Sequence, residues 1–439
     1  MNVALLKPAP ERVPNDLFAD ARSRLPGTGP VADLRAASFA DFAARGLPHR
    51  RIEEWKYTDL RALLGQVAPL AAAPDEAALA RAKAALAKLD VTGTARFVLV
   101  DGVFAAELSD APAAGVTLRR LSAVLEDETN TVRADLLRTN ATGDVMVAFN
   151  AALATDGVVI GVADGAKPEK PLHIVHVATQ SAVSIATRSF LQLGKNAQAT
   201  LVESFVTADG AHDYQTHDAV VIWLGDDAVL EHVRLVEDAH DAANISTAIV
   251  TLGAKTRFNT FSITTGAHVS RYQAFVRFNG EEAHASINGI NLLKERQHGD
   301  ATLVLDHAVP NCDSREEFRA VVDDSARSVF QGRINVHPDA QKTDAKMMTR
   351  ALLLSDEAEA DNKPELEIFA DDVTCGHGAT TGALDDSLLF YLRARGLPEK
   401  EAQAMLIQAF VGEAIETIAD DSLREAAETA AERWLKARS

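Results

Sequence analysis

Cysteine is scarce in this sequence: its 439 residues include only two, Cys312 and Cys375. Two thiols cannot build the disulfide framework that stabilises many small secreted proteins, and they cannot provide the four thiolates of a closed structural metal site. A cluster or metal site that uses these cysteines would therefore need ligands from another chain.

Long apolar segments are missing as well. No stretch approaches the roughly 20 apolar residues that a membrane-spanning helix requires. The first residues, Met1 to Pro10, contain no apolar run of the kind found in secretory signal peptides. The sequence therefore predicts a protein of the cytoplasm.

Positive charge is in short supply, because 44 Lys and Arg residues stand against 63 Asp and Glu residues, a net charge of -19. Such a chain repels phosphate backbones and anionic lipid surfaces, so we expect neither a nucleic acid nor a membrane as partner. The sequence also lacks a phosphate-binding loop, a Gly-x-Ser-x-Gly elbow and a His-Glu-x-x-His pair. These absences argue against ATP hydrolysis and against the commonest hydrolase mechanisms.

The N-terminal region is rich in alanine and leucine and is punctuated by glycine and proline turns. This composition predicts short helices, together with one hairpin that turns at Asp101-Gly102. We predict a mostly helical N-terminal domain over residues 1–155.

From residue 156 to residue 380 the pattern changes to short runs rich in Val, Ile, Thr and Phe, which are typical of strands. Similar turns follow several runs, and their glycines, Gly194, Gly225, Gly253 and Gly280, are separated by 31, 28 and 27 residues. This period predicts stacked coils, each built from two or three strands that cannot bury an apolar face alone. We predict a mainly β protein with a parallel β-helix core over 156–380, although a jelly roll would give a similar number of strands.

Residues 381–439 are predicted to form a C-terminal domain of three helices. In the second of them, Leu406, Phe410, Ala414 and Ile418 repeat every four residues and form a broad apolar face. A bundle of fewer than about 60 residues has a marginal core of its own. We therefore expect these helices to dock on the β-helix or on a partner protein.

The segment around Cys375 and His377 places a thiol beside an imidazole. In an extended strand, residues two apart point to the same face, so these side chains lie together, with Gly376 on the opposite face. Such a pair is half of a metal or cluster site. The spacing alone favours the plainer interpretation, in which a small buried residue packs beside a hydrogen-bonded histidine.

Several motifs, in order along nearly the whole chain, resemble the SufB/SufD family of iron-sulfur cluster assembly proteins. They are Trp55-Lys56-Tyr57-Thr58, Asn311-Cys312-Asp313-Ser314-Arg315, Val329-Phe330-Gln331-Gly332-Arg333-Ile334, Lys342-Thr343-Asp344-Ala345-Lys346, Lys363-Pro364-Glu365-Leu366-Glu367-Ile368 and Phe390-Tyr391-Leu392-Arg393-Ala394-Arg395-Gly396. So many ordered matches are highly specific. Within this family the chain most resembles SufD, because it has only two cysteines, whereas SufB proteins carry more, and because of the tryptophan segment.

This resemblance implies a scaffold subunit without catalytic activity, in a complex of one SufB, two SufC ATPases and one SufD. It implies that the edge of the β-helix joins SufB, that the C-terminal helices dock SufC, and that SufC hydrolyses ATP. Carried over by motif, Cys375 and His377 lie at the SufB interface, where a nascent cluster forms. Many relatives have serine between these two residues; Gly376 lacks that hydroxyl group but leaves both ligand types in place.

The resemblance also implies that the isolated chain holds no stable cofactor and that an iron-sulfur cluster is bound only transiently at the SufB interface. It leaves open whether the isolated chain forms a homodimer through the same edge. It also leaves open whether a flavin or iron binds the complex.

Two other functions remain open from the residues themselves. A carbohydrate-active enzyme on a β-helix would carry acids and basic groups along a groove on the coils, and its isolated chain would turn over acidic glycans. A purely structural interaction protein would use Cys375 and His377 only for packing.

Overall fold

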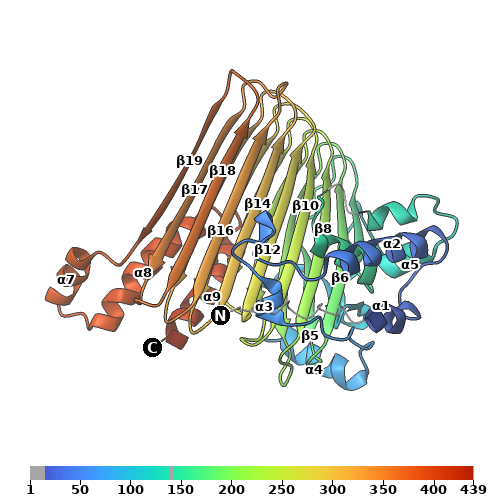
Figure 1. Ribbon diagram of the computed structural model, residues 1–439, viewed down its shortest axis with the longest axis horizontal. Helices are drawn as coiled ribbons and strands as arrows, with labels where there is room; N and C mark the ends of the chain where they lie inside the picture. The colour runs from blue at the N-terminus through green and yellow to red at the C-terminus, as the bar shows by residue number, and fades with distance from the viewer. Residues whose placement is uncertain (1–14, 139–141, 439) are drawn as a thin grey trace, which may run out of the picture.

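The computed structural model describes residues 15–138 and 142–438 (Figure 1). The start of the predicted N-terminal domain, including the segment from Met1 to Pro10, lies outside the described residues. The dominant feature is a pair of long sheets between which the chain alternates, strand after strand. The strands stack along the length of the molecule, from the N-terminal helices at one end to β17, β18 and β19 at the other (Figure 1).

Sheet A contains nine of the described strands and sheet B contains ten. In chain order, the strands of sheet A are β3 (Val116–Arg120), β4 (Val158–Val162), β6 (Ser184–Leu193), β8 (Gln215–Leu224), β10 (Ala243–Leu252), β12 (Val269–Phe278), β14 (His298–His307), β16 (Arg327–Val336) and β18 (Glu359–Ile368). Those of sheet B are β1 (Ala95–Val100), β2 (Val103–Phe104), β5 (Leu172–Ala178), β7 (Gln198–Thr207), β9 (Val229–Glu237), β11 (Arg257–Thr264), β13 (His284–Leu293), β15 (Asp313–Val322), β17 (Asp344–Leu353) and β19 (Thr374–Gly382).

The described α-helices flank this pair of sheets. They are α1 (Asn15–Arg22), α2 (Pro30–Arg45), α3 (Leu60–Leu64), α4 (Glu76–Leu86), α5 (Leu121–Glu126), α6 (Val145–Leu153), α7 (Asp386–Ala394), α8 (Glu399–Ile415) and α9 (Asp421–Arg438). No helix in the described part of the chain is long and apolar enough to cross a membrane.

Parallel pairing between every second strand makes the architecture a β-solenoid of about 8 turns. Gln215, for example, pairs with Ser184 on one side and with Ala243 on the other, one coil away in each direction. The predicted parallel β-helix is therefore confirmed, with two strands in each coil. The predicted hairpin at Asp101-Gly102 is also present, as the antiparallel pair β1–β2 at one end of sheet B.

The glycines that revealed the repeat stack at one corner of the solenoid. A Cβ atom on Gly280 would lie 1.9 Å from the backbone nitrogen of Ala254 in the preceding coil, and one on Gly225 would lie 3.0 Å from the carbonyl carbon of Gly194. A side chain on Gly280 would overlap the backbone of the preceding coil, and one on Gly225 would crowd it, so these corners favour glycine. The spacing of the glycines thus reports the length of one coil.

Two of the three C-terminal helices, α8 and α9, pack on the outer face of sheet B. Ile407 and Val411 of α8 and Leu423 and Trp434 of α9 are buried in one cluster with apolar residues of sheet B, such as Phe261 of β11. The expected docking on the β-helix is confirmed. The predicted face is confirmed in part: Ala414 and Ile418 are buried in this cluster and Phe410 packs against it, but Ile407 and Val411, which the prediction left out, are buried there as well.

Helices α2 and α6 cover the outer face of sheet A, whereas α4 packs on β1 and β5 of sheet B. Phe42 of α2 and Phe149 of α6 contact each other, with ring centroids 4.8 Å apart, and lie in one cluster with Ile245 of β10. A segment between α2 and α3, residues 50–59, runs onward across sheet A; we call it the strap. It holds the N-terminal layer to the later coils of the solenoid.

The strap is fixed at several strands. The ring of Trp55 is buried and lies 3.8 Å from the guanidinium carbon of Arg271 on β12. Thr58 lies 2.9 Å from Nε2 of His298 on β14. Glu53 pairs with Lys363 on β18 at 2.5 Å. The strap therefore reaches from the middle of sheet A to its last strand.

Acid should weaken the contact between the strap and β14. Burial lowers the pKa of His298 to about 4, below the usual 6.5. Because the unfolded chain takes up this proton first, the stability from neutral His298 is present above about pH 6.5 and is lost as the pH falls toward 4. In His298→Gln the amide can still bond Thr58 but does not titrate. We expect its free energy of unfolding to fall by about 2 kcal/mol less than that of the parent between pH 7 and pH 5. Urea midpoints at both pH values test this, and parallel changes in the two proteins would contradict it.

Candidate functional site

The solenoid ends at an open edge formed by β18 and β19 (Figure 1). Among the described strands, β19 pairs only with β17 and β18 pairs only with β16. One row of backbone N–H and C=O groups on each last strand therefore has no neighbouring strand within the described chain. Such an edge is a template on which another chain can add a strand.

Cys375 and His377 lie on β19, at this edge. Cys375 is in register with Ala345 of β17, and His377 with Met347. Ala345 and Met347 are buried in the core between the two sheets. Cys375 and His377 therefore continue two inward-facing rows to the last coil, where no further coil covers them. Cys375 is half-buried against the core and His377 is exposed.

The environment of Cys375 keeps its thiol protonated in the isolated chain. Burial raises the pKa of Cys375, and the negative charges of Asp344 and Glu316 act in the same direction. A thiolate is the form that binds metal, so this site needs a cation or a positively charged partner before Cys375 can act as a ligand.

The pair is also incomplete as a metal site. Within residues 15–138 and 142–438, no third His, Cys, Asp or Glu side chain joins Cys375 and His377 to form a metal-binding group. Stable sites for zinc or iron-sulfur clusters use three or four protein ligands. The arrangement thus provides two ligand types at an edge and leaves the remaining positions open.

Gly376 lies on the opposite face of β19 from this pair. A Cβ atom added to Gly376 would meet no heavy atom within 4 Å. Packing therefore does not require glycine at this position, and a serine would fit there without moving Cys375 or His377.

The other cysteine, Cys312, is not part of the edge. It is fully buried, and its Sγ donates a hydrogen bond to the carbonyl oxygen of Gly280 at 3.4 Å. Burial raises the pKa of Cys312, which makes the thiol unreactive.

This difference predicts how many thiols react. We expect a thiol reagent such as dithionitrobenzoate to modify one cysteine per folded chain, Cys375, and two cysteines in denaturant. The Cys375→Ser variant should show no reactive thiol until it unfolds. Two fast-reacting thiols in the folded parent would contradict the burial of Cys312.

A second candidate surface lies on α7 and the start of α8. Leu388, Phe390, Tyr391 and Met405 are 52%, 74%, 54% and 49% exposed, and α7 projects away from the sheets (Figure 1). No residue of α7 is buried. From sequence, such large side chains are expected to pack inward, so their exposure here marks a contact surface.

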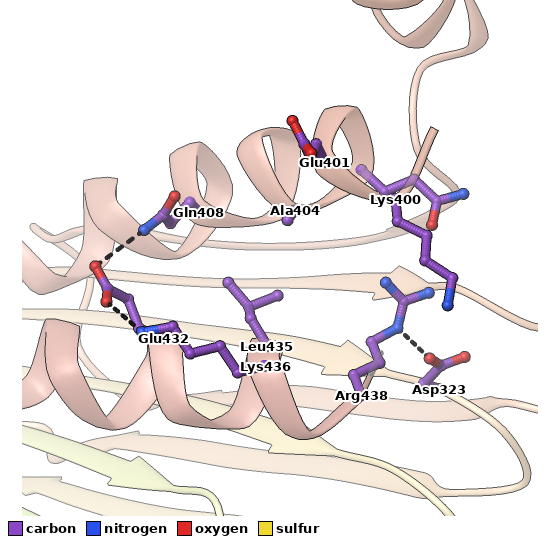
Figure 2. Close-up of a pocket in the computed structure, with 10 residues that line it drawn as sticks. Asp323, Lys400, Glu401, Ala404, Gln408, Glu432, Leu435, Lys436 and Arg438 are labelled. Carbon is purple, nitrogen blue, oxygen red and sulfur yellow. Dashed lines mark hydrogen bonds and ion pairs between the residues drawn. The ribbon is translucent and has the colours of Figure 1, made fainter. Parts of the chain in front are cut away.

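A groove of about 510 Å³ separates α8 from α9 (Figure 2). Several charges pair around it: Arg438 with Asp323 beyond β15, and Glu432 with both Gln408, at 3.4 Å, and Lys436, at 3.3 Å. These contacts join the two helices to each other and to the solenoid. No motif in the sequence predicts this groove.

The sequence compares with known families along almost its whole length. Residues 176–410 match the family described as SUF system FeS cluster assembly, SufBD core domain. Residues 15–174 match the SufBD protein N-terminal region. The chain belongs to the SufB/SufD family. The resemblance inferred from the motifs is thereby confirmed. The match to the core domain covers most of the solenoid, all of α7 and most of α8.

Two of three similar curated proteins carry the same assignment in their names. The iron-sulfur cluster assembly protein SufD of Escherichia coli is 32% identical over 384 residues, which cover 87% of each chain. An iron-sulfur cluster assembly SufBD family protein of Synechocystis is 30% identical over 86% of this chain and 85% of its own. The chloroplastic protein ABCI7 of Arabidopsis thaliana is 27% identical over 95% and 88%. This SufBD-family chain is thus most like SufD.

Proposed function

We propose that this SufBD-family chain is the SufD-like scaffold subunit of a cytoplasmic complex with SufB and the SufC ATPase. Its role is to help assemble iron-sulfur clusters, and ATP hydrolysis is supplied by SufC. The observation that carries the proposal is the open edge of the solenoid, where Cys375 and His377 end two inward-facing rows. The similarity to SufD of Escherichia coli over most of both chains supports the same assignment.

SufB pairs with the edge formed by β18 and β19. Two related solenoids that meet edge to edge continue their sheets across the interface, and both satisfy their unpaired backbone groups. The isolated chain has the same free edge, so in the absence of SufB a second copy can occupy it as a homodimer.

SufC docks on the exposed surface of α7 and α8. Phe390 and Tyr391 are large apolar side chains that solvent exposure penalises, and aromatic residues of this kind dominate protein interfaces. Because α8 is packed on sheet B, a SufC subunit bound there is mechanically connected to the solenoid.

The growing cluster is the cargo of this complex. His377, with Cys375, provides ligands from one side of the interface, and SufB provides the others. Since two ligands hold a cluster weakly, the finished cluster can leave, and the isolated chain keeps none.

Co-purification tests the partners. A tag on this chain, co-expressed with SufB and SufC, should recover both in a fixed ratio. We expect Phe390→Asp to lose SufC and keep SufB, whereas Ser387→Asp on the same helix should keep both.

The edge is tested separately with Ala379→Pro. The backbone N–H of Thr374 bonds to β17, so that of Ala379, an odd number of residues along β19, points to the open side. Proline there removes an edge donor without removing a bond to β17, and it should lose SufB while keeping SufC. A chain that purifies alone, or that turns over acidic glycans, would contradict the proposal.

A further inference from the structure

The interior of the solenoid is apolar along one side and polar along the other. Six buried polar side chains meet between the sheets in the early coils, and we call them the interior polar cluster: His176, Thr187, Glu203, Asp218, His232 and Arg234. They come from five neighbouring strands, β5 to β9. This cluster is separated from Cys375 by most of the solenoid.

Three members of the cluster bring potential ligand atoms together. One atom each of His176, Glu203 and Asp218 lies within 4.8 Å of the other two. Nε2 of His176 is 3.9 Å from Oδ1 of Asp218. In the part of the chain that the structure describes, no other three His, Cys, Asp or Glu side chains come together in this way.

The surrounding residues orient these three side chains. Glu203 Oε2 lies 2.8 Å from Nε2 of His232 and 3.3 Å from Nε of Arg234. Thr187 donates a hydrogen bond to Asp218 Oδ1 at 2.6 Å. The ring of His176 stacks on Phe205, with centroids 4.4 Å apart. Outer contacts of this kind fix the direction of ligands in metal sites.

Two buried polar atoms of the group have no hydrogen-bond partner in the protein. They are Nε2 of His176 and Oε1 of Glu203, and both are shielded from solvent. A buried polar atom without a hydrogen bond costs about 1–3 kcal/mol. Two such atoms beside a second carboxylate, that of Asp218, indicate a position that a ligand completes.

We propose that His176, Glu203 and Asp218 bind a first-row divalent metal ion, such as Zn²⁺ or Fe²⁺, inside the solenoid. One imidazole nitrogen with two carboxylate oxygens suits these ions better than Ca²⁺ or Mg²⁺, which prefer oxygen ligands alone. The site stands independently of the proposed scaffold function, since it uses no residue of the edge.

Charge is consistent with an ion at this position. The two carboxylates balance a divalent charge, while Arg234 stays on the far oxygen of Glu203. A small cavity of about 10 Å³ lies beside the group: His176 lines it, but Glu203 and Asp218 do not.

Metal binding by the full chain tests the site. The starting protein carries Cys375→Ser and His377→Ala, so that the edge cannot contribute, and is stripped with a chelator. Equilibrium dialysis against Zn²⁺ alone should then give one ion per chain. Co²⁺ alone should give the visible absorption of a coordinated ion.

Asp218→Asn provides the decisive comparison. Asparagine has the shape of the neutral acid, so the empty protein should fold like its parent, which unfolding without metal will check. We expect Zn²⁺ affinity to fall more than about 100-fold, since the loss of an outer-shell contact alone costs about 10–100-fold. Saturating Zn²⁺ should raise the melting temperature of the parent but not that of the variant.

Asp156→Asn is the matched control. Asp156 is equally buried, but its carboxylate already accepts hydrogen bonds from Ser122 and Arg120, at 2.9 and 3.0 Å. Affinity should be unchanged in this control. If Asp218→Asn does not fold, His176→Gln takes its place. A stripped parent that binds no Zn²⁺ or Co²⁺, or a ligand variant that binds as tightly as the parent, would overturn the proposal.

Discussion

Replacing His377 by alanine should lower iron-sulfur cluster assembly by the reconstituted SufBCD complex by about tenfold or more, while the complex still forms. His377 is exposed on the last strand and no described acid, cysteine or histidine completes its site within the chain. Removing a ligand from a shared site should cost at least as much as losing an outer-shell contact, which is about 10–100-fold. Because alanine removes no buried contact, the melting temperature of the isolated chain should stay the same. Cluster assembly is measured by the visible absorption of the cluster and by iron and sulfide content.

His212→Ala is the matched control for this prediction. His212 is 65% exposed in the turn between β7 and β8. We expect full assembly in this variant. Cys375→Ser separates the two candidate ligands, because it should also reduce assembly if the thiol binds the cluster. Full assembly by His377→Ala would remove the ligand assignment, and full assembly by the double variant would favour the interpretation in which both residues only pack.

The solenoid could be predicted because its repeat is visible in the spacing of the corner glycines, which contacts between coils favour. The corner glycines, such as Gly280, are forced by backbone contact between coils, so their spacing measures the coil directly. Strand runs of Val, Ile and Thr then follow from burial between parallel strands. The placement of Cys375 and His377 on one face likewise needed only the two-residue period of a strand.

The contacts of the terminal helices were harder to predict. In α8, Ile407 and Val411 are buried against sheet B, whereas Leu406 and Phe410 of the predicted row are only half-buried. In α7 the structure buries no residue, and Leu388 and Phe390 are exposed. Helix periodicity identifies an apolar face but not the partner that covers it.

The interior polar cluster was not predictable from spacing at all. His176, Glu203 and Asp218 are separated by 27 and 15 residues and belong to both sheets. The register that brings these three together depends on the length of every intervening turn. A parallel solenoid thus creates sites from residues with no local signature.

Asp300→Ala should destabilise the protein by about 3–5 kcal/mol, the second large effect that we expect. Asp300 is buried on β14 and pairs with Arg271, whose guanidinium group is fully buried beneath Trp55. Thr58 of the strap also donates a hydrogen bond to this carboxylate. Alanine would leave Arg271 charged, buried and without its counter-ion, and would release one anchor of the strap.

Urea or thermal unfolding of Asp300→Ala, beside Asp209→Ala, measures this effect. Asp209 forms an exposed pair with Lys88, at 2.9 Å, so its loss should cost less than about 1 kcal/mol. The double change Arg271→Met with Asp300→Leu should recover much of the stability, since it removes both charges and keeps the volume. Equal, small effects of Asp300→Ala and Asp209→Ala would contradict a strap held by a buried ion pair.

If the strap also supports β18 through Glu53 and Lys363, Asp300→Ala should weaken binding of SufB at the edge, although Asp300 lies two strands away from it in sheet A.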